Sequence, residues 1–310
     1  MRLGHRREED PEPNPRVGCP TFVMKPRREP TAPLDPLFKG WAKPGPIPPG
    51  AREHPFQLEP GETLDALGGY FRIFQLSNGH RFSTDDVLTA WYGTSWCPCA
   101  RRVLDLGSGL GSVGMLAAWR LPGARFVAIE AQETSVQLSR KSARYNGLES
   151  RYEIRLGDFR EPSAVLPGER FDLILASPPY FPPGSGLEGD HPQKIACRFE
   201  MRGGIEDYCG VAAAHLEPGG LFACVFPTDQ IERVQKGAAD AGLTILRRRP
   251  VVLKEPDPPL LNLFAMSRSA DLPMEFRVRT WVDPELVIRT AAGEVHPEYS
   301  AVKLSIGFPP

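Results

Sequence analysis

Residues 103–115 have the sequence VLDLGSGLGSVGM, in which an aliphatic run gives way to a cluster of glycines and then to a second apolar stretch. The first run, which includes Asp105, is typical of a buried strand, and the spacing after Gly111 is typical of a helix. Glycines at 107, 109 and 111 let backbone amides approach a ligand closely. The stretch therefore predicts a strand–turn–helix unit of an α/β fold, with a ligand site where the strand ends.

The segments around this unit alternate between short apolar runs and amphipathic stretches. The apolar runs predict strands over 101–107, 124–131, 152–159, 171–180, 221–227, 243–252 and 260–268. The amphipathic stretches predict helices over 111–121, 132–147, 205–220 and 228–242. This alternation predicts a Rossmann-like α/β domain with a doubly wound, mostly parallel, seven-stranded sheet. Two further runs, 274–282 and 285–290, predict additional strands at an antiparallel edge.

Composition divides the chain into an arm and one folded domain. The predicted parts are the arm (1–60), an N-terminal segment of the domain (61–100), the α/β core (101–250) and C-terminal edge strands (251–310). The arm is rich in proline and in charges of both signs, which predicts a disordered or loosely docked segment. Residues 68–79 predict a hairpin because an alternating run precedes the turn signal SNG. Ser83 or Thr84 is the predicted N-cap of the helix that follows.

The gross composition is that of an ordinary globular protein. The 310 residues carry a formal net charge of −1, so nucleic-acid contact would require a local basic patch. Of the six cysteines only Cys97 and Cys99 are close together, and this spacing predicts neither a disulfide framework nor a metal site. No apolar run approaches the roughly 20 residues that span a bilayer. We expect a cytoplasmic monomer with no membrane contact and no metal.

The glycine cluster is compatible with two ligand classes. Gly109, Gly111 and Gly114 fit G-x-G-x-x-G, and Glu130 follows about 20 residues later, as in dinucleotide sites. However, Asp105 lies just before the glycines, where a carboxylate would repel a pyrophosphate. The same carboxylate would bind the amino group of a methionine-like ligand, and Glu130 would bind the hydroxyls of any ribose.

The third strand ends in Asp158 and Phe159, which offer a polar edge and an apolar face to an adenine ring. Together with Asp105 and Glu130, these residues predict an S-adenosylmethionine site at the carboxyl ends of the strands. An NAD dehydrogenase is the weaker alternative.

The fourth strand runs directly into the sequence ASPPYF, residues 176–181. Transfer of a methyl group to an exocyclic amine needs acceptors for the amine hydrogens, because they favour the pyramidal, nucleophilic nitrogen. Ser177 offers a side-chain oxygen, and the Pro178 carbonyl offers a second acceptor whose direction the prolines fix. Tyr180 offers a face on which an unstacked base can lie. The candidate catalytic residues are Ser177, Pro178, Pro179 and Tyr180.

These motifs resemble a known family. DLGSGLG, LGDF and ASPPYF are similar to the motifs of amino-methyltransferases with an N-P-P-Y-type turn. The stretches GGYFRIFQLSNGHRFSTDDVLTAWY, YFPPGSG…ACRFE and IRTAAGEVHPEYSAVKLSIGF narrow the resemblance to the bacterial tRNA1(Val) (adenine-N6)-methyltransferases, over roughly residues 62–308. The family usually has Asn where this chain has Ser177, and Cys197 separates Ala196 from Arg198 in the stretch after the turn.

The resemblance implies a class I methyltransferase that uses S-adenosylmethionine as its cofactor. The residues expected to bind the cofactor are Asp85, Asp105, Gly107, Ser108, Gly109, Gly111, Glu130, Ala131, Asp158 and Phe159. The residues expected to bind substrate are Phe181, Arg198, Glu200, Arg247 and Arg248. Arg198 and Glu200 follow a glycine-rich loop over 181–192 that could close over substrate, although a plain surface ion pair is the alternative. Arg247 and Arg248, with Lys254, form the strongest local basic patch for phosphates.

The sequence therefore predicts methyl transfer from S-adenosylmethionine to an exocyclic amine, with N6 of adenine-37 in a tRNA(Val)-like RNA as the first hypothesis. Three alternatives remain open: guanine N2 of ribosomal RNA, the side-chain amide of a glutamine in a protein, and an inactive partner subunit that binds the cofactor. The replacement of Asn by Ser177 bears on the target, because a hydroxyl is shorter than an amide.

Overall fold

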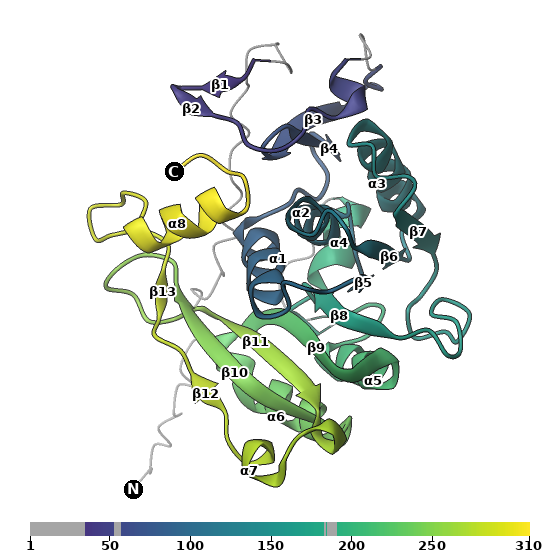
Figure 1. The fold of residues 1–310 in the computed structure, drawn as a ribbon, viewed down its shortest axis with the longest axis vertical. Helices are drawn as coiled ribbons and strands as arrows, with labels where there is room; N and C mark the ends of the chain where they lie inside the picture. Colours follow the sequence, from purple (N-terminus) through teal and green to yellow (C-terminus); the bar gives the residue numbers. More distant parts are fainter. Residues whose placement is uncertain (1–34, 53–56, 183, 185–190) are drawn as a thin grey trace, which may run out of the picture.

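A computed structural model describes residues 35–52, 57–182, 184 and 191–310. Its centre is a nine-stranded sheet with the order β12-β10-β11-β9-β8-β5-β6-β7, in which β13 also pairs with β10. The long strands are β5 (Arg102–Leu106), β6 (Arg125–Glu130), β7 (Tyr152–Leu156), β8 (Phe171–Ala176), β9 (Leu216–Pro227), β10 (Leu243–Val252) and β11 (Leu261–Arg268). The predicted doubly wound, mostly parallel sheet is confirmed (Figure 1).

The strand directions give the sheet a parallel half and a mixed half. β7, β6, β5, β8 and β9 are parallel, so their carboxyl ends meet at one edge of the sheet. β11 is antiparallel to both neighbours and lies between β9 and β10, two positions in from the edge. The edge itself consists of two-residue strands, β12 (Trp281–Val282) and β13 (Leu286–Val287), which pair in parallel with β10. Such short edge strands offer little unpaired backbone to another sheet.

Helices cover both faces of the sheet. One face carries α1 (Thr84–Trp96), α2 (Ser112–Arg120) and α3 (Glu133–Tyr145), and the other carries α5 (Ile205–His215) and α6 (Ile231–Asp240) (Figure 1). Alternate side chains of a strand point to opposite faces. Accordingly Val103 packs with α2, whereas Leu104 packs with α5 and α6. The central strands β5 and β8 are buried on both faces, which explains why their sequences are largely apolar.

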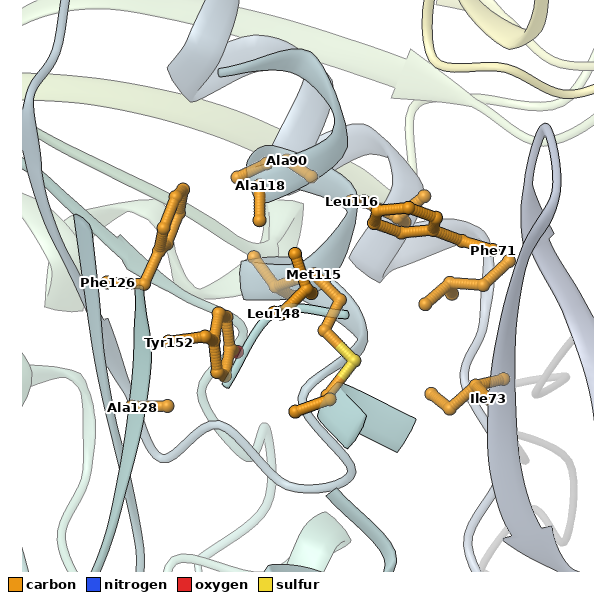
Figure 2. Close-up of a cluster of buried hydrophobic side chains, with 14 of the residues drawn as sticks. Phe71, Ile73, Ala90, Met115, Leu116, Ala118, Phe126, Ala128, Leu148 and Tyr152 are labelled. Atoms are coloured by element: carbon orange, nitrogen blue, oxygen red, sulfur yellow. The ribbon is translucent and has the colours of Figure 1, made fainter. Parts of the chain in front are cut away.

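The core on the first face is closed by large side chains from several elements (Figure 2). Met115 of α2 lies among Phe126, Tyr152 and Leu148, and the rings of Phe126 and Tyr152 stack at 5.6 Å between centroids. Phe71 comes from a separate two-stranded hairpin, β3 (Glu62–Gly68) and β4 (Phe71–Leu76), and packs in the same cluster. This core fixes α2, and therefore the glycine turn that precedes it, against the sheet.

The hairpin is held to α3 by specific hydrogen bonds. Asn146, just after α3, accepts from the Arg72 amide at 2.9 Å and donates to the Arg72 carbonyl at 2.8 Å. Ser142 accepts from the Phe74 amide at 2.9 Å. The predicted hairpin is present, but its strands are joined at Gly69 and Tyr70; residues 77–79 form a separate bend, in which the Gly79 amide donates to the Leu76 carbonyl at 3.3 Å. Gly68 and Gly69 at this turn have φ values of 126° and 52°, which other residues adopt at a cost.

The predicted arm falls partly on residues that the structure describes. Residues 1–34 and 53–56 lie outside them. Between these segments the chain forms a short hairpin, β1 (Leu37–Phe38) and β2 (Trp41–Ala42), and a 3₁₀ turn, η1 (Pro49–Ala51). The glycine of that turn, Gly50, lies so close to Tyr145 that a Cβ would come within 2.6 Å of the ring. This part of the predicted arm therefore packs on α3.

The C-terminal prediction of strands over 274–282 and 285–290 is largely wrong. Residues 274–277 form a helical turn, α7 (Met274–Arg277), and the strands β12 and β13 have two residues each. A further helix, α8 (Pro297–Ser305), follows, with Pro297 at its first position and the His296 ring accepting from the Glu298 amide. Proline at that position favours a helix start, because its φ is helical and its missing N–H has no helical partner. The remaining short elements are α4 (Pro192–Arg198), η2 (Thr228–Gln230) and η3 (Ser269–Asp271).

Among the residues that the structure describes, no helix combines the length and apolar character that a bilayer crossing requires.

Candidate active site

A cavity of about 990 Å³ lies at the carboxyl ends of the parallel strands. The glycine turn after β5 and the Ser-Pro-Pro-Tyr turn after β8 both line it. The predicted site residues on its wall are Asp85, Asp105, Gly107, Ser108, Gly109, Glu130, Ala131, Asp158, Phe159, Ser177, Pro178, Pro179, Tyr180, Phe181 and Arg198. Because β5 and β8 are adjacent and parallel, the turns that follow them open on the same side of the sheet.

The glycine turn has the backbone shape that close approach requires. Gly107, Gly109 and Gly111 have φ values of 62°, 55° and 80°. No atom would lie within 4 Å of a Cβ on Gly109, so the backbone there faces open space. The Ser108 hydroxyl is buried and has no hydrogen-bond partner within the described chain. Both features fit a ligand that would occupy the turn.

Gly107 and Gly111 have packing roles as well. A Cβ on Gly107 would come within 2.4 Å of the Tyr208 hydroxyl, so α5 packs closely on the turn. Gly111 is the N-cap of α2 and does not line the cavity; a Cβ there would come within 2.5 Å of the Ser139 hydroxyl on α3. The sequence predicted that Gly111 binds the cofactor. In the structure Gly111 instead lies between α2 and α3 and is not on the cavity wall.

Buried carboxyl groups dominate one side of the cavity. Asp105 is 1% exposed and accepts from the Gly114 amide at 2.9 Å. Burial raises the pKa of Asp105 to about 8. Glu130 accepts from the amides of Gly109 and Gln132 at 2.8 and 2.7 Å, and burial raises its pKa as well. Carboxyl groups that are costly to ionise when buried together favour a cationic ligand.

The two residues that the sequence predicted to lie beside an adenine ring, Asp158 and Phe159, both line the cavity. Asp158 pairs with Arg160 at 2.6 Å, and its hydrogen bonds from that side chain lower its pKa. Phe159 is buried and packs on Tyr208, with 4.4 Å between ring centroids. An ionised oxygen edge and an apolar ring therefore lie side by side on the cavity wall.

These side chains fit S-adenosylmethionine. Asp105 can bind the amino group of the methionine moiety, and Glu130 can bind the ribose hydroxyls. The free hydroxyl of Ser108 and the open face of Gly109 leave room for the methionine end of the ligand. The two buried acids, Asp105 and Glu130, also suit the positive charge of a sulfonium, since opposite charges attract most strongly away from water.

The Ser-Pro-Pro-Tyr turn is held mainly through Tyr180. Its hydroxyl donates to Asp85 at 2.7 Å, and its ring packs edge-on against Phe226 with 5.7 Å between centroids. Asp85 belongs to the first turn of α1, where Ser83 is the N-cap as predicted and the Asp86 carboxylate accepts from the Ser83 amide. Asp85 was expected to bind cofactor; in this structure its carboxylate lines the cavity and binds the tyrosine of the turn.

The segment after α4 lies along the turn. The Phe181 amide donates to the Arg198 carbonyl at 3.2 Å, and the Glu200 amide donates to the Phe181 carbonyl at 2.8 Å. The Arg198 guanidinium lies 5.9 Å from the centroid of the Phe181 ring. Arg198 and Glu200 form no surface pair with each other, because Glu200 pairs with Arg233 at 2.5 Å and does not line the cavity. Of the predicted closing loop, residues 183 and 185–190 lie outside the described residues.

The predicted phosphate patch does not lie at the cavity. Arg247 pairs with Asp283 at 2.5 Å and stacks on Trp96 at 3.8 Å. Arg248 donates to Asn262 at 3.4 Å. Both arginines project from the middle of β10, several residues before the strand reaches the cavity edge at Leu253. Arg247 therefore forms an ion pair within the fold and Arg248 a hydrogen bond to a neutral amide, and the sequence alone does not show these partners.

Several residues on the cavity wall were not identified from the sequence. His80 and Asp86 lie near the start of α1, and burial lowers the pKa of His80 while it raises that of Asp86. Tyr208 reaches back from α5 to the glycine turn. Lys194 and Arg202 flank Arg198 at intervals of four residues, and that spacing was visible in the sequence. Within the described residues no group of acidic, histidine or cysteine side chains could hold a metal ion.

Comparison with known proteins agrees with this geometry. A family model described as "Methyltransferase domain" matches residues 100–236. A tRNA1(Val) (adenine(37)-N6)-methyltransferase of Porphyromonas gingivalis is 30% identical over 236 residues, covering 74% of this chain and 89% of the relative. A release factor glutamine methyltransferase of Moorella thermoacetica is 31% identical over 160 residues, covering 47% of this chain and 53% of that protein.

Among solved structures, a predicted O-methyltransferase of Agrobacterium tumefaciens superposes with a TM-score of 0.52 at 17% identity, over 73% of this chain and 98% of that one. At this identity the likeness establishes the class I methyltransferase fold alone. The extent and identity of the Porphyromonas match go further. The chain is an S-adenosylmethionine-dependent methyltransferase and belongs to the tRNA1(Val) (adenine(37)-N6)-methyltransferase family.

Proposed function

We propose that this enzyme methylates N6 of an adenine in tRNA, with adenine-37 of a tRNA(Val)-like RNA as the target, and that it acts in the cytoplasm. One observation carries the proposal: the glycine turn and the Ser-Pro-Pro-Tyr turn line one cavity. A donor bound along the first turn and a flat amine held by the second would meet there. The relatives whose names include this activity support the choice of target.

The chain's own side chains supply the acceptor geometry. S-adenosylmethionine, when bound, supplies an electrophilic methyl group. The Ser177 hydroxyl and the Pro178 carbonyl accept the two amine hydrogens, which makes the nitrogen lone pair available for in-line attack. The new N–C bond forms as the S–C bond breaks, and the proton that the nitrogen then loses passes to solvent. Tyr180 and Phe181 present rings on which an unstacked base would lie.

A row of cations favours a nucleic acid over a protein as the acceptor. Lys194, Arg198 and Arg202 are four residues apart and line the cavity, and none forms an ion pair with a described residue. Two like charges four residues apart on α4 repel each other and destabilise the helix slightly. Phosphates flanking a target base would neutralise such a row. The glutamine methyltransferase relative keeps a protein acceptor as the second candidate.

The test is transfer of labelled methyl groups to defined acceptors. Purified enzyme with labelled S-adenosylmethionine is incubated separately with unmodified tRNA(Val) transcript, with ribosomal RNA and with a release-factor protein. Mass spectrometry of the digested acceptors identifies the product. N6-methyladenosine in the tRNA supports the proposal. Label in guanine of ribosomal RNA or in glutamine contradicts it, and no transfer to any acceptor, with tight binding of S-adenosylhomocysteine, would indicate a cofactor-binding partner subunit.

A further inference from the structure

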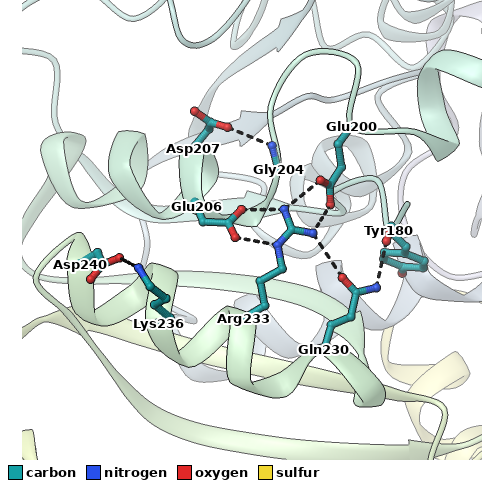
Figure 3. A network of polar contacts seen from close by, with 9 residues as sticks. All are labelled: Tyr180, Glu200, Gly204, Glu206, Asp207, Gln230, Arg233, Lys236 and Asp240. Carbon is teal, nitrogen blue, oxygen red and sulfur yellow. Dashed lines mark hydrogen bonds and ion pairs between the residues drawn. The ribbon is translucent and has the colours of Figure 1, made fainter. Parts of the chain in front are cut away.

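A network of hydrogen bonds and ion pairs contacts the Ser-Pro-Pro-Tyr turn through residues that do not line the cavity (Figure 3). The Gln230 side-chain amide donates to the Tyr180 carbonyl at 2.9 Å. The Gln230 side-chain oxygen in turn accepts from Arg233 at 3.3 Å. Gln230 directly precedes α6 and Arg233 lies in its first turn, so both are carried by an element that packs on the sheet. Neither residue lines the cavity.

Arg233 ties the same network to the segment that runs beside the turn. Its guanidinium bonds Glu200 at 2.5 and 2.8 Å and Glu206 at 2.6 and 2.7 Å. The Glu200 side chain is only 7% exposed, and its backbone amide binds the Phe181 carbonyl. Gly204 leaves space for the guanidinium, because a Cβ there would come within 2.3 Å of it. Charge-assisted hydrogen bonds of this kind hold the side chains in one relative orientation.

The turn is therefore held at its last residue, Tyr180, by two separate contacts. Tyr180 is held by Asp85 through its hydroxyl and by Gln230 through its carbonyl. Pro179 has a locked φ, so few rotations remain between the Tyr180 carbonyl and the Pro178 carbonyl. Holding the first carbonyl thus limits the directions of the second, which is the proposed acceptor of an amine hydrogen.

We propose that Gln230 and Arg233 are positioning residues that aim the Pro178 carbonyl at the acceptor amine. This inference rests on the proposed function only in that an amine is the acceptor. It concerns tRNA adenine and any other amine substrate alike. Because both residues act through the turn, their loss should lower kcat while leaving cofactor affinity unchanged.

The sharpest variant is Gln230→Glu, which keeps the size of the side chain and its acceptor for Arg233. It replaces the amide donor by a carboxylate oxygen that repels the Tyr180 carbonyl. Arg233→Met removes the guanidinium but keeps the aliphatic stem. Lys236→Met, on the same helix, is the control, because Lys236 pairs only with Asp240 and both are exposed.

We expect kcat for the acceptor that the wild-type enzyme methylates to fall about tenfold or more in Gln230→Glu and Arg233→Met, because small misplacements of reacting groups slow catalysis steeply. The KM for S-adenosylmethionine and the affinity for S-adenosylhomocysteine should not change, and Lys236→Met should match the wild type. Hydrogen–deuterium exchange in the peptide covering 177–182 should be about fivefold faster in Gln230→Glu, and exchange at 105–111 should not change.

Unchanged kcat and unchanged exchange in both variants would overturn the inference. So would a parallel loss of kcat, cofactor affinity and melting temperature, since that pattern indicates a merely structural role. If the wild-type enzyme methylates no RNA but exchange at the turn still quickens in Gln230→Glu, the proposed substrate fails while the positioning role stands.

Discussion

Asp105 illustrates how one buried carboxyl group links cofactor binding to pH. Its pKa of about 8 means that it is mostly protonated at pH 7 in the free protein. Binding of an ammonium group would favour the carboxylate, so the proton must leave as the ligand binds. The burial of Asp105 therefore predicts two effects. A proton is released when the ligand binds, and the free energy of unfolding depends on pH.

We predict that S-adenosylhomocysteine binding at pH 7 releases about one proton, because the ligand ammonium stabilises ionised Asp105. Calorimetry in buffers of different ionisation enthalpy measures this number directly. In Asp105→Asn the release should fall towards zero and affinity should drop. A wild-type binding enthalpy that does not depend on the buffer would show that Asp105 stays protonated in the complex.

We also predict that Asp105 makes the ligand-free protein less stable as pH rises. Its pKa in the folded state lies above the unfolded value of about 3.9, so between about pH 4 and 8 the folded state binds more protons than the unfolded state. The free energy of unfolding must fall over that interval. Between pH 5 and 8.5 the melting temperature of the wild type should fall further than that of Asp105→Asn. Equal falls would contradict the raised pKa.

Ser177 is the residue at which this chain departs from the resemblance. We predict that Ser177→Ala lowers kcat by about 10² or more, because one of two hydrogen-bond partners of the reacting group is lost. Ser177→Asn should retain activity on adenine, since its amide oxygen can accept the same hydrogen. Steady-state methyl transfer with tRNA(Val) transcript measures both, with S-adenosylhomocysteine affinity as the folding control. Full activity of Ser177→Ala would reject the amine-binding role.

At the scale of elements, α1 is the helix whose packing matters most to the site. Its first turn carries Asp85 and Asp86, and its middle lies on β8 and β9 through Gly93. A Cβ on Gly93 would come within 2.4 Å of Leu175 and within 3.2 Å of Ala223. The absence of a side chain therefore sets the distance between helix and sheet.

We predict that Gly93→Ala lowers the free energy of unfolding by about 1–3 kcal/mol, because the core has no room for the methyl group. Gly210→Ala is the matched control within α5: no described atom lies within 4 Å of its Cβ, so helix propensity should raise stability by up to about 1 kcal/mol. Chemical denaturation distinguishes the two. Equal effects would mean that α1 can shift without cost.

At this scale the sequence also shows where prediction works. The strands β5, β6 and β8 were predictable because each is dominated by an apolar run, and β7 because Tyr152, Ile154 and Leu156 alternate with charged residues. The position of β11 between β9 and β10 was not predictable from the sequence. Strand order depends on which sheet edges remain free after the other strands have paired. The helix α8 was missed because its start depends on Pro297 and a histidine cap rather than on apolar periodicity.

Across the whole molecule, charge is arranged unevenly although the net charge is only −1. The acids Asp105, Glu130 and Asp158 lie where the cofactor would bind, and the row Lys194, Arg198 and Arg202 lies on α4 and just after it. The arginines of β10 pair within the fold instead. Among the described residues, the row Lys194, Arg198 and Arg202 would give an RNA substrate a positive surface at the cavity.

We predict that Lys194→Met and Arg202→Met each reduce the salt dependence of tRNA binding. Every lost phosphate contact should lower the slope of log K against log salt by about 0.7–1. Arg125→Met is the control, because Arg125 begins β6 at the end of the strand remote from the cavity. Filter binding between low and moderate salt measures the slopes. Slopes that match the wild type in both variants would assign RNA contact to another surface.

By itself the sequence determined the alternation of strands and helices, the glycine turn after β5 and the Ser-Pro-Pro-Tyr turn after β8. Local spacing and backbone preference are sufficient for these features, because they depend on residues near one another in the chain. Only the tertiary structure decided that Arg247, Arg248 and Glu200 serve the fold, that Asp85 binds Tyr180, and that Gln230 grips the turn from behind. These contacts join residues that are far apart in the sequence. Which charged or amide side chains lie within hydrogen-bond distance is decided only when the strands have paired and the helices have packed on the sheet.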